Sequence, residues 1–344
     1  MELHELKTRL QAHLSDGLIL VVGSGLSCAE GLPGMRDLAA HLCQTIVAES
    51  NEAQDWNEIV ALIQEKGLEA ALLQKAPSQR LEAAISAETG VFFAEAERSV
   101  ISEVFEGRRT LRLTPLLAHM LKPFSGLPII TTNYDRLIEV AVEEAGLGVD
   151  TMFSGRFAGS LNERESHLSF CRNATYKKPR VILQYKTRAL VYKPHGSLDW
   201  YLRNGVPVSY QGELKSAARL IITPGQNKFR NGYESPFDQH RARANDAIDR
   251  ASRFLIIGYG FNDDHLETHL SPAIRGGKPT LLLTYELSNS AKDLASKYGN
   301  VMAIDREFRD GVEGSRVIID RNHIFLPKLK LWDVKYFVTE VFEP

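Results

Sequence analysis

Leu18-Ile-Leu-Val-Val-Gly-Ser-Gly-Leu-Ser-Cys-Ala-Glu-Gly-Leu-Pro33 joins an apolar run to a Gly-Ser-Gly turn and a Gly-Leu-Pro turn. Such apolar runs are typical of strands buried on both faces of a parallel sheet. Glycines after a strand let backbone N–H groups approach an anion. A dinucleotide fingerprint would place a third glycine at Cys28, where there is none. The loop is therefore either a nucleotide-binding loop of another kind or a tight turn that needs glycine for packing.

The same alternation of strand and helix patterns continues along the chain. Alternation of this kind predicts an α/β fold with a Rossmann-like, doubly wound parallel sheet. In such a sheet the strands end at one common edge, where ligands bind. The predicted strands are 18–22, 128–133, 191–196, 219–224, 254–258 and 280–284, and the predicted helices are 6–14, 37–43, 135–144, 236–252, 263–269 and 290–298.

We predict a single domain over residues 1–344 with a core at 15–48 and 122–300. Residues Ala53–Gln74 and Gln79–Phe105 are rich in Ala, Leu, Glu, Gln and Lys, which favours a helical insertion at about 52–121. Residues 146–190 are weakly patterned, with one possible strand at 181–185. We expect residues 301–344 to form a C-terminal extension packed onto the domain.

The bulk composition is that of a globular protein and excludes several function classes. The chain has 344 residues, 44% of them hydrophobic, and a formal net charge of −2. The charge gives no reason to expect direct nucleic-acid binding. No apolar run reaches the roughly 18 residues of a membrane span. The first residues predict a helix, not a signal peptide, and the three cysteines form no CxxC pair, so we expect a cytoplasmic protein without disulfides or structural zinc.

Unusual residues follow four of the predicted strands: Gly23, Asn133, His195 and Gly258. We expect them at the same edge of the sheet. Asn133 offers an amide that could hold a water or a ribose hydroxyl. His195 is suited to proton handling near neutral pH, although a histidine at a strand end is often structural.

Polar residues in two of these segments have an alternative structural role. Asp135 could receive a carboxamide or begin the helix that follows, and we favour the second role. Asn262 or Asp263 could serve only as a helix N-cap. No metal site is predicted, because the His265 and His269 pair lacks an evident third ligand.

Taken in order, these segments resemble the sirtuin family. Gly23–Arg36 is similar to the sirtuin Gly-Ala-Gly-x-Ser…Gly-Ile-Pro-x-x-Arg loop, and Thr131–Leu137 to Thr-Gln-Asn-x-Asp-x-Leu. His195-Gly196 matches the sirtuin His-Gly pair. Gly258–Asp263 takes the place of the Gly-Thr-Ser loop and resembles the form found in bacterial sirtuin-like defence proteins.

The chain departs from deacylating sirtuins at three places. It has no cysteine after Cys171, so the four-cysteine zinc module is missing. Gly34-Met35 replaces the usual Asp-Phe, and Thr223–Gly225 replaces the Phe-Gly-Glu segment that pairs with an acyl-lysine peptide. The resemblance thus implies an NAD hydrolase of anti-phage defence, with NAD as substrate and no metal. An NAD-dependent deacylase or ADP-ribosyltransferase, and a non-catalytic NAD or ADP-ribose sensor, remain alternatives.

The resemblance also implies roles for particular residues. Asn133 would position the attacking water, and His195 would bind the ribose hydroxyls and accept a proton. Ser24 and Gly25 would hold the diphosphate, Arg36 would neutralise phosphate charge, and Glu286 would bind the adenosine ribose. The full set of NAD-binding residues is Gly23, Ser24, Gly25, Ser27, Pro33, Arg36, Thr132, Asp135, Gly258, Tyr259, Gly260, Phe261 and Glu286.

The implied partners follow from the toxicity of NAD hydrolysis, which must be restrained until it is needed. The chain shows no obvious sensor domain. We therefore expect regulation by assembly, as a homo-oligomer or with a separate HerA-type ATPase. The helical insertion is the surface that we expect to take part.

Overall fold

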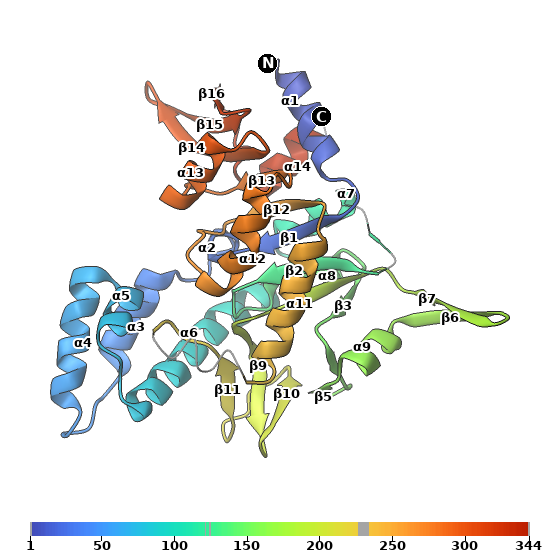
Figure 1. Cartoon of the computed structure of the whole chain (residues 1–344). Coiled ribbons are helices and arrows are strands. Elements are labelled where there is room, and N and C mark those ends of the chain that lie inside the picture. The colour runs from blue at the N-terminus through green and yellow to red at the C-terminus, as the bar shows by residue number, and fades with distance from the viewer. Residues whose placement is uncertain (1, 121, 124, 226–233, 343–344) are drawn as a thin grey trace.

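A nine-stranded sheet forms the centre of the molecule in a computed structural model that describes residues 2–120, 122–123, 125–225 and 234–342 (Figure 1). Its order is β16-β15-β14-β13-β12-β1-β2-β8-β3, parallel from β14 to β3. This confirms the predicted doubly wound α/β fold. The strands are β1 (Leu18–Val22), β2 (Leu127–Thr131), β3 (Gly148–Asp150), β8 (Arg188–Tyr192), β12 (Arg253–Ile257), β13 (Thr280–Leu283), β14 (Val301–Arg309), β15 (Val312–Ile319) and β16 (Asn322–Pro327).

Strand β1 is the topological switch point of this sheet. All five of its residues are buried, between β2 on one side and β12 on the other. Leu18, Leu20 and Val22 pack in one core layer, and Ile19 and Val21 pack in the opposite layer. Because the chain adds strands outward in both directions from β1, the loop after Val22 lies where a ligand crevice is expected.

Helices cover both faces of the sheet. The first layer buries Leu6 and Leu10 of α1, as the sequence predicted, and the second buries Ala244 and Ile248 of α11. The first layer contains α1 (Leu3–His13), α7 (Leu113–His119), α8 (Leu137–Glu144) and α14 (Val334–Phe342); the second contains α11 (Phe237–Arg250), α12 (Asp264–Arg275) and α13 (Asn289–Lys297).

A helical module lies to one side of the sheet (Figure 1). It consists of α3 (Met35–Thr45), α4 (Ala53–Lys66), α5 (Leu68–Gln74) and α6 (Gln79–Phe105), and it has a hydrophobic cluster of its own. The helix-favouring stretch over 53–74 forms two helices, because Gly67, with a φ of 87°, ends α4 and precedes α5. The end of the predicted insertion at Leu121 lies outside the described residues.

The weakly patterned segment contains more structure than the single strand predicted there. It contributes to a second, antiparallel sheet of order β11-β9-β10-β5-β4. The predicted strand near Arg219 belongs to this sheet and not to the main one. The strands of the second sheet are β4 (Phe153–Ser154), β5 (Ala158–Leu161), β9 (Gly196–Arg203), β10 (Val206–Tyr210) and β11 (Ala218–Ile221). Between β5 and β9 lie the helix α9 (Glu163–Ser169) and a separate two-stranded sheet of β6 (Cys171–Lys177) and β7 (Arg180–Tyr185).

The C-terminal residues extend the main sheet. Strand β14 pairs in parallel with β13, so the main sheet continues past residue 300. Strands β15 and β16 then add an antiparallel edge, and α14 buries Phe337 and Val338 in the first layer. None of the helices in the described ranges combines the length and apolar character needed to cross a bilayer.

Candidate functional site

The glycine loop after β1 and the loop after β12 pack backbone against backbone. Gly23 precedes the short helix α2 (Ser24–Ala29). A Cβ atom added at Gly23 would lie 2.5 Å from the carbonyl oxygen of Gly258, and one added at Gly258 would lie 2.6 Å from the amide nitrogen of Leu26. The N–H of Gly25 donates to the Gly258 carbonyl at 2.9 Å, so this donor is already used inside the protein. Packing therefore accounts for these glycines without a bound phosphate.

Asn133 lies just past β2 and is held by three contacts. Its side-chain nitrogen donates to the carbonyl oxygen of Gly23 at 3.0 Å and to the Ser27 hydroxyl at 2.8 Å. Its backbone N–H donates to the Thr131 hydroxyl at 3.1 Å. Because a carbonyl oxygen only accepts, the contact with Gly23 fixes which end of the amide faces the glycine loop.

Asp135 connects this segment to the glycine loop and to the helix that follows. One carboxylate oxygen accepts from the Ser27 hydroxyl at 2.7 Å, and the other accepts from the Leu137 N–H at 3.2 Å. The second contact satisfies an N–H at the start of α8, which is the structural role favoured from the sequence. Asp135 is 5% exposed, so both contacts are made away from bulk water.

His195 follows β8 and faces a carboxylate. Its Nε2 lies 2.8 Å from Oδ2 of Asp263. The other carboxylate oxygen of Asp263 accepts from the Leu266 N–H at 2.9 Å, so Asp263 is the predicted N-cap of α12 as well. The sequence did not predict the pairing with His195. Gly196 is required next to it, because a Cβ atom there would lie 2.0 Å from the Leu220 carbonyl oxygen.

A buried lysine fixes the segment that carries Asn133. Lys193 is 0% exposed, and its Nζ donates to the carbonyl oxygens of Asp135 and Tyr134. Its charge is balanced by Glu139, with Nζ 3.0 Å from Oε1. Burial raises the pKa of Glu139, and Lys193 opposes that rise. Lys193 thereby joins the segment before His195 to the loop that carries Asn133, a contact the sequence did not reveal.

These segments line a cavity of about 400 Å³ at the carboxyl edge of the sheet. The helical module contributes Glu69 and Phe93 to its wall, and Ile222 and Pro224 come from the segment after β11. The cavity brings together the predicted residues Gly23, Ser24, Ser27, Pro33, Thr132, Asn133, Asp135, His195, Tyr259 and Gly260, along with Asp263.

The remaining predicted residues do not line this cavity. Arg36 is exposed on α3, and Phe261 is 6% exposed in the second core layer. Gly25 and Gly258 line a neighbouring cavity of about 410 Å³. Glu286 is exposed and lies next to Tyr285 in the chain, which lines that second cavity.

The second cavity is partly aromatic. Tyr285 and Trp332 meet edge to face, with ring centroids 5.1 Å apart. Trp332 comes from the segment before α14, and no motif marked it as a site residue. The backbones at Gly25 and Gly258 contribute to this cavity, while Gly23 and Tyr259 contribute to the first, so the packed glycine loops lie between the two.

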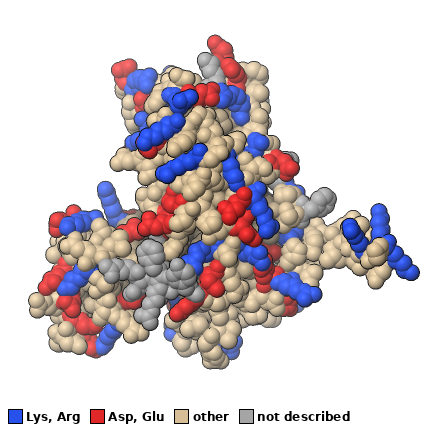
Figure 2. Space-filling view, in the orientation of Figure 1, with Lys and Arg blue, Asp and Glu red and all other residues tan. Residues whose placement is uncertain are grey.

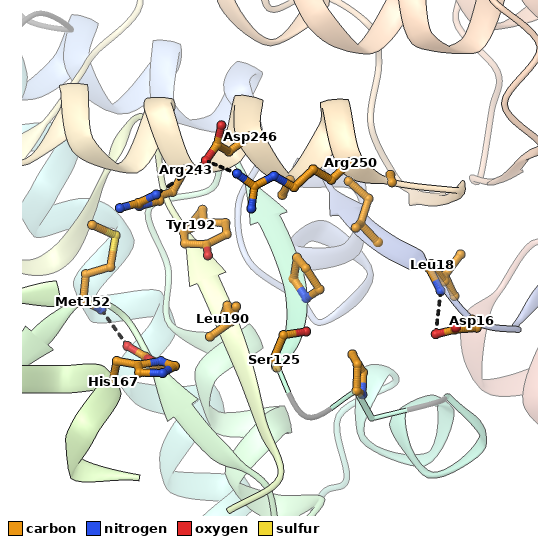
Figure 3. Close-up of a pocket in the computed structure, with 18 of the residues that line it drawn as sticks. Asp16, Leu18, Ser125, Met152, His167, Leu190, Tyr192, Arg243, Asp246 and Arg250 are labelled. Carbon is orange, nitrogen blue, oxygen red and sulfur yellow. Dashed lines mark hydrogen bonds and ion pairs between the residues drawn. The ribbon is translucent and has the colours of Figure 1, made fainter. Parts of the chain in front are cut away.

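A third cavity, of about 420 Å³, lies where β1 begins, away from the glycine loop (Figure 3). Arg243 and Arg250 both approach Asp246 at 3.4 Å, and Arg243 also contacts Glu163 at 2.7 Å. None of the predicted site residues lines it. Within the described ranges, no group of three or more His, Cys, Asp and Glu side chains is placed to hold a metal ion.

Comparison with known proteins gives one family and a set of distant structures. A family model described as a SIR2-like domain matches residues 128–302, which is 175 of the 344 residues. No curated protein matches. Similar solved structures include one described as the structural basis for the mechanism and regulation of Sir2 enzymes, with 10% identity over 98% of both chains and a TM-score of 0.41. Others are Sir2 bound to acetylated peptide (12% identity, 84% of this chain and 89% of that chain, TM-score 0.37) and a Sir2 homolog–NAD complex (13%, 83% and 84%, 0.38).

Proposed function

The chain belongs to the SIR2-like domain family, and from this premise we propose that it hydrolyses NAD to nicotinamide and ADP-ribose. One observation carries the proposal: Asn133 and the paired His195 and Asp263 line the same cavity, beside the packed glycine loops. The nicotinamide ribose would occupy this cavity. The adenosine would occupy the neighbouring cavity, against Tyr285 and Trp332.

The residues of the first cavity can carry out each step of the hydrolysis. The bond between ribose C1′ and the nicotinamide nitrogen breaks, and its electron pair returns to the ring, which leaves neutral and needs no acid. Asn133 has its amide nitrogen held by Gly23 and Ser27, so its amide oxygen is positioned to accept from the attacking water. The water oxygen bonds to C1′, and His195 accepts the proton that is released.

Asp263 would orient the imidazole for this step. Its Oδ2 lies 2.8 Å from Nε2, so its negative charge would stabilise the imidazolium that forms when His195 accepts the proton. A histidine oriented by a carboxylate is a recurring arrangement in enzymes that move protons at neutral pH.

The decisive experiment is product analysis. NAD is incubated with the wild type and with Asn133→Ala and His195→Ala, and free nicotinamide and ADP-ribose are quantified. Asn57→Ala and His4→Ala, at exposed positions on α4 and α1, serve as matched controls. We expect release by the wild type and the controls and its loss in both site variants. No release by the wild type, alone or with a cognate ATPase, would contradict hydrolysis.

The same assay separates the alternative activities. Nicotinamide release that requires a labelled acyl-peptide would indicate a deacylase, and label transferred to protein would indicate an ADP-ribosyltransferase. Pro224 lines the cavity and has no N–H to donate to an added peptide strand, which favours hydrolysis. NAD binding without turnover, unchanged in His195→Ala, would indicate a sensor.

The biological role that we propose is NAD depletion in anti-phage defence, in the cytoplasm, restrained by assembly with further copies or with a HerA-type ATPase. The family resemblance of the glycine and His-Gly segments supports this role. Restraint by assembly predicts that the rate of nicotinamide release changes when the cognate ATPase is added. Full activity of an isolated monomer, unaffected by the ATPase, would contradict it.

A further inference from the structure

Residues 171–186 form an arm that no other described strand covers. Strands β6 and β7 pair only with each other, and they project from the body of the molecule (Figure 1). An isolated two-stranded hairpin is at best marginally stable in water. The arm therefore needs an additional surface to pack against.

One face of the arm is apolar and exposed, and the other is mainly polar, with Ile182 as its large apolar residue. Directly paired residues lie on the same face, and the register pairs Ala174 with Leu183 and Tyr176 with Val181. Tyr176 is 77% exposed and Val181 is 48% exposed. Contiguous exposed apolar side chains mark an interaction surface.

The charge of the arm indicates what covers it. Residues 171–186 contain Arg172, Lys177, Lys178, Arg180 and Lys186 and no acidic residue. Two arms packed on each other would bring like charges together, which is unfavourable. A surface that is acidic and partly apolar would complement the arm.

The helical module of this same chain offers such a surface. Residues 52–105 contain ten acidic and four basic residues. Between α4 and α5 lies an open groove of about 460 Å³ with Ala61 and Leu62 among its lining residues. The full lining of this α4–α5 groove is Glu58, Ala61, Leu62, Glu65, Gln74 and Lys75. Glu58 is paired with Lys75 at 2.5 Å, so Glu65 is the carboxylate of the groove that would face a basic arm.

We propose that the arm of one copy docks in the α4–α5 groove of a second copy. The arm and α4 project from opposite sides of the molecule, so the arm of one copy cannot reach the α4–α5 groove of the same copy (Figure 1). Figure 2 shows basic side chains at the end of the arm, and acidic side chains interspersed with basic ones over the helical module. Because the contact joins two different surfaces, it is head-to-tail and can close into a ring or continue as a chain.

Complementary variants test this contact in the full-length protein. The arm variant carries Tyr176→Asp and Arg180→Glu, and the groove variant carries Ala61→Arg and Glu65→Arg, all at exposed positions. We expect sedimentation velocity to show concentration-dependent assembly of the wild type and monomers of each variant. An equimolar mixture should give dimers and nothing larger, since one variant offers only a groove and the other only an arm.

Matched controls make the outcome interpretable. Arg164→Glu on α9 and Glu144→Arg on α8 change the same charges at exposed sites outside both surfaces, and they should assemble as the wild type does. Circular dichroism checks that every variant is folded. A wild type that stays monomeric at all concentrations, an arm variant that assembles normally, or a mixture that remains monomeric would overturn the proposal. So would a monomer whose arm instead binds anionic vesicles or nucleic acid.

Discussion

Two aspartates of the candidate site each make two kinds of contact, one with a helix N-terminus and one with another side chain of the site. Asp263 is the N-cap of α12 and also the carboxylate that faces His195. Asp135 accepts from the Ser27 hydroxyl and from the Leu137 N–H at the start of α8. Because the same side chains satisfy helix ends and site contacts, the site is built on rigid elements and not on free loops.

The Asp263→Asn variant separates the role of Asp263 as the N-cap of α12 from its role beside His195. Asparagine is also a good N-cap, so the melting temperature should change little. Loss of the charge that orients His195 should lower kcat by about ten- to a hundredfold, the scale seen when the partner of a metal-ligating histidine is removed. KM for NAD should stay near the wild-type value. We would measure steady-state nicotinamide release; an unchanged kcat would show that Asp263 is only a cap.

At the scale of elements, one ion pair links the helical module to the site. Glu97 of α6 is 0% exposed, and Arg136 donates to it from Nε at 3.0 Å and from its terminal nitrogen at 2.6 Å. Arg136 also donates to Gln211 in the loop before β11. Arg136 is the residue immediately before α8. It thus connects the helical module to the segment after β2 and to the second sheet.

The Arg136→Met variant should lose about 3–5 kcal/mol of unfolding free energy, the scale for breaking one side of a buried pair. The loss arises because Glu97 would remain buried without its counter-charge, and burial already raises the pKa of Glu97. Urea denaturation measures it. The double variant Glu97→Leu, Arg136→Met should recover much of the loss, and a double variant as unstable as the single one would contradict this account.

At the scale of the whole molecule, burial of ionisable groups couples folding to pH. His240 of α11 is 0% exposed, packs against Trp200 and accepts from the Lys193 N–H at 3.2 Å. Burial, with a contribution from Lys193, lowers the pKa of His240 to about 3. In the unfolded chain the imidazole has its usual pKa of about 6.5.

Between pH 6.5 and 3 the unfolded chain therefore binds a proton at His240 that the folded chain does not bind. Stability should fall as the pH falls through this window, by up to about 1.4 kcal/mol per pH unit from this group. His240→Asn, which can still accept from Lys193, should flatten the dependence measured by urea denaturation from pH 6.5 to 4. The exposed His4→Asn is the control and should leave the slope unchanged. An equal slope in His240→Asn would contradict the assignment.

The sequence by itself determined the central parallel strands of the main sheet and the edge at which the candidate site lies. Strands buried on both faces, such as β1 and residues 254–257 of β12, are continuously apolar, so they stand out as runs. The right-handed connections of such a sheet then place the residues after each strand at one edge. This is why Gly23, Asn133 and His195 could be expected together, as the structure places them.

Only the tertiary structure decided which side chains support those residues. Two of these supporting contacts join parts of the chain that are distant in sequence: Asp263 lies beside His195, and Lys193 binds the segment that carries Asn133. Two other residues carry no local sequence pattern: Trp332 lines the second cavity and Glu69 lines the first. The second sheet was missed for a related reason. Strands such as β5 and β10 are short and partly exposed, and their mixed residues are stabilised by cross-strand neighbours that a local pattern does not reveal.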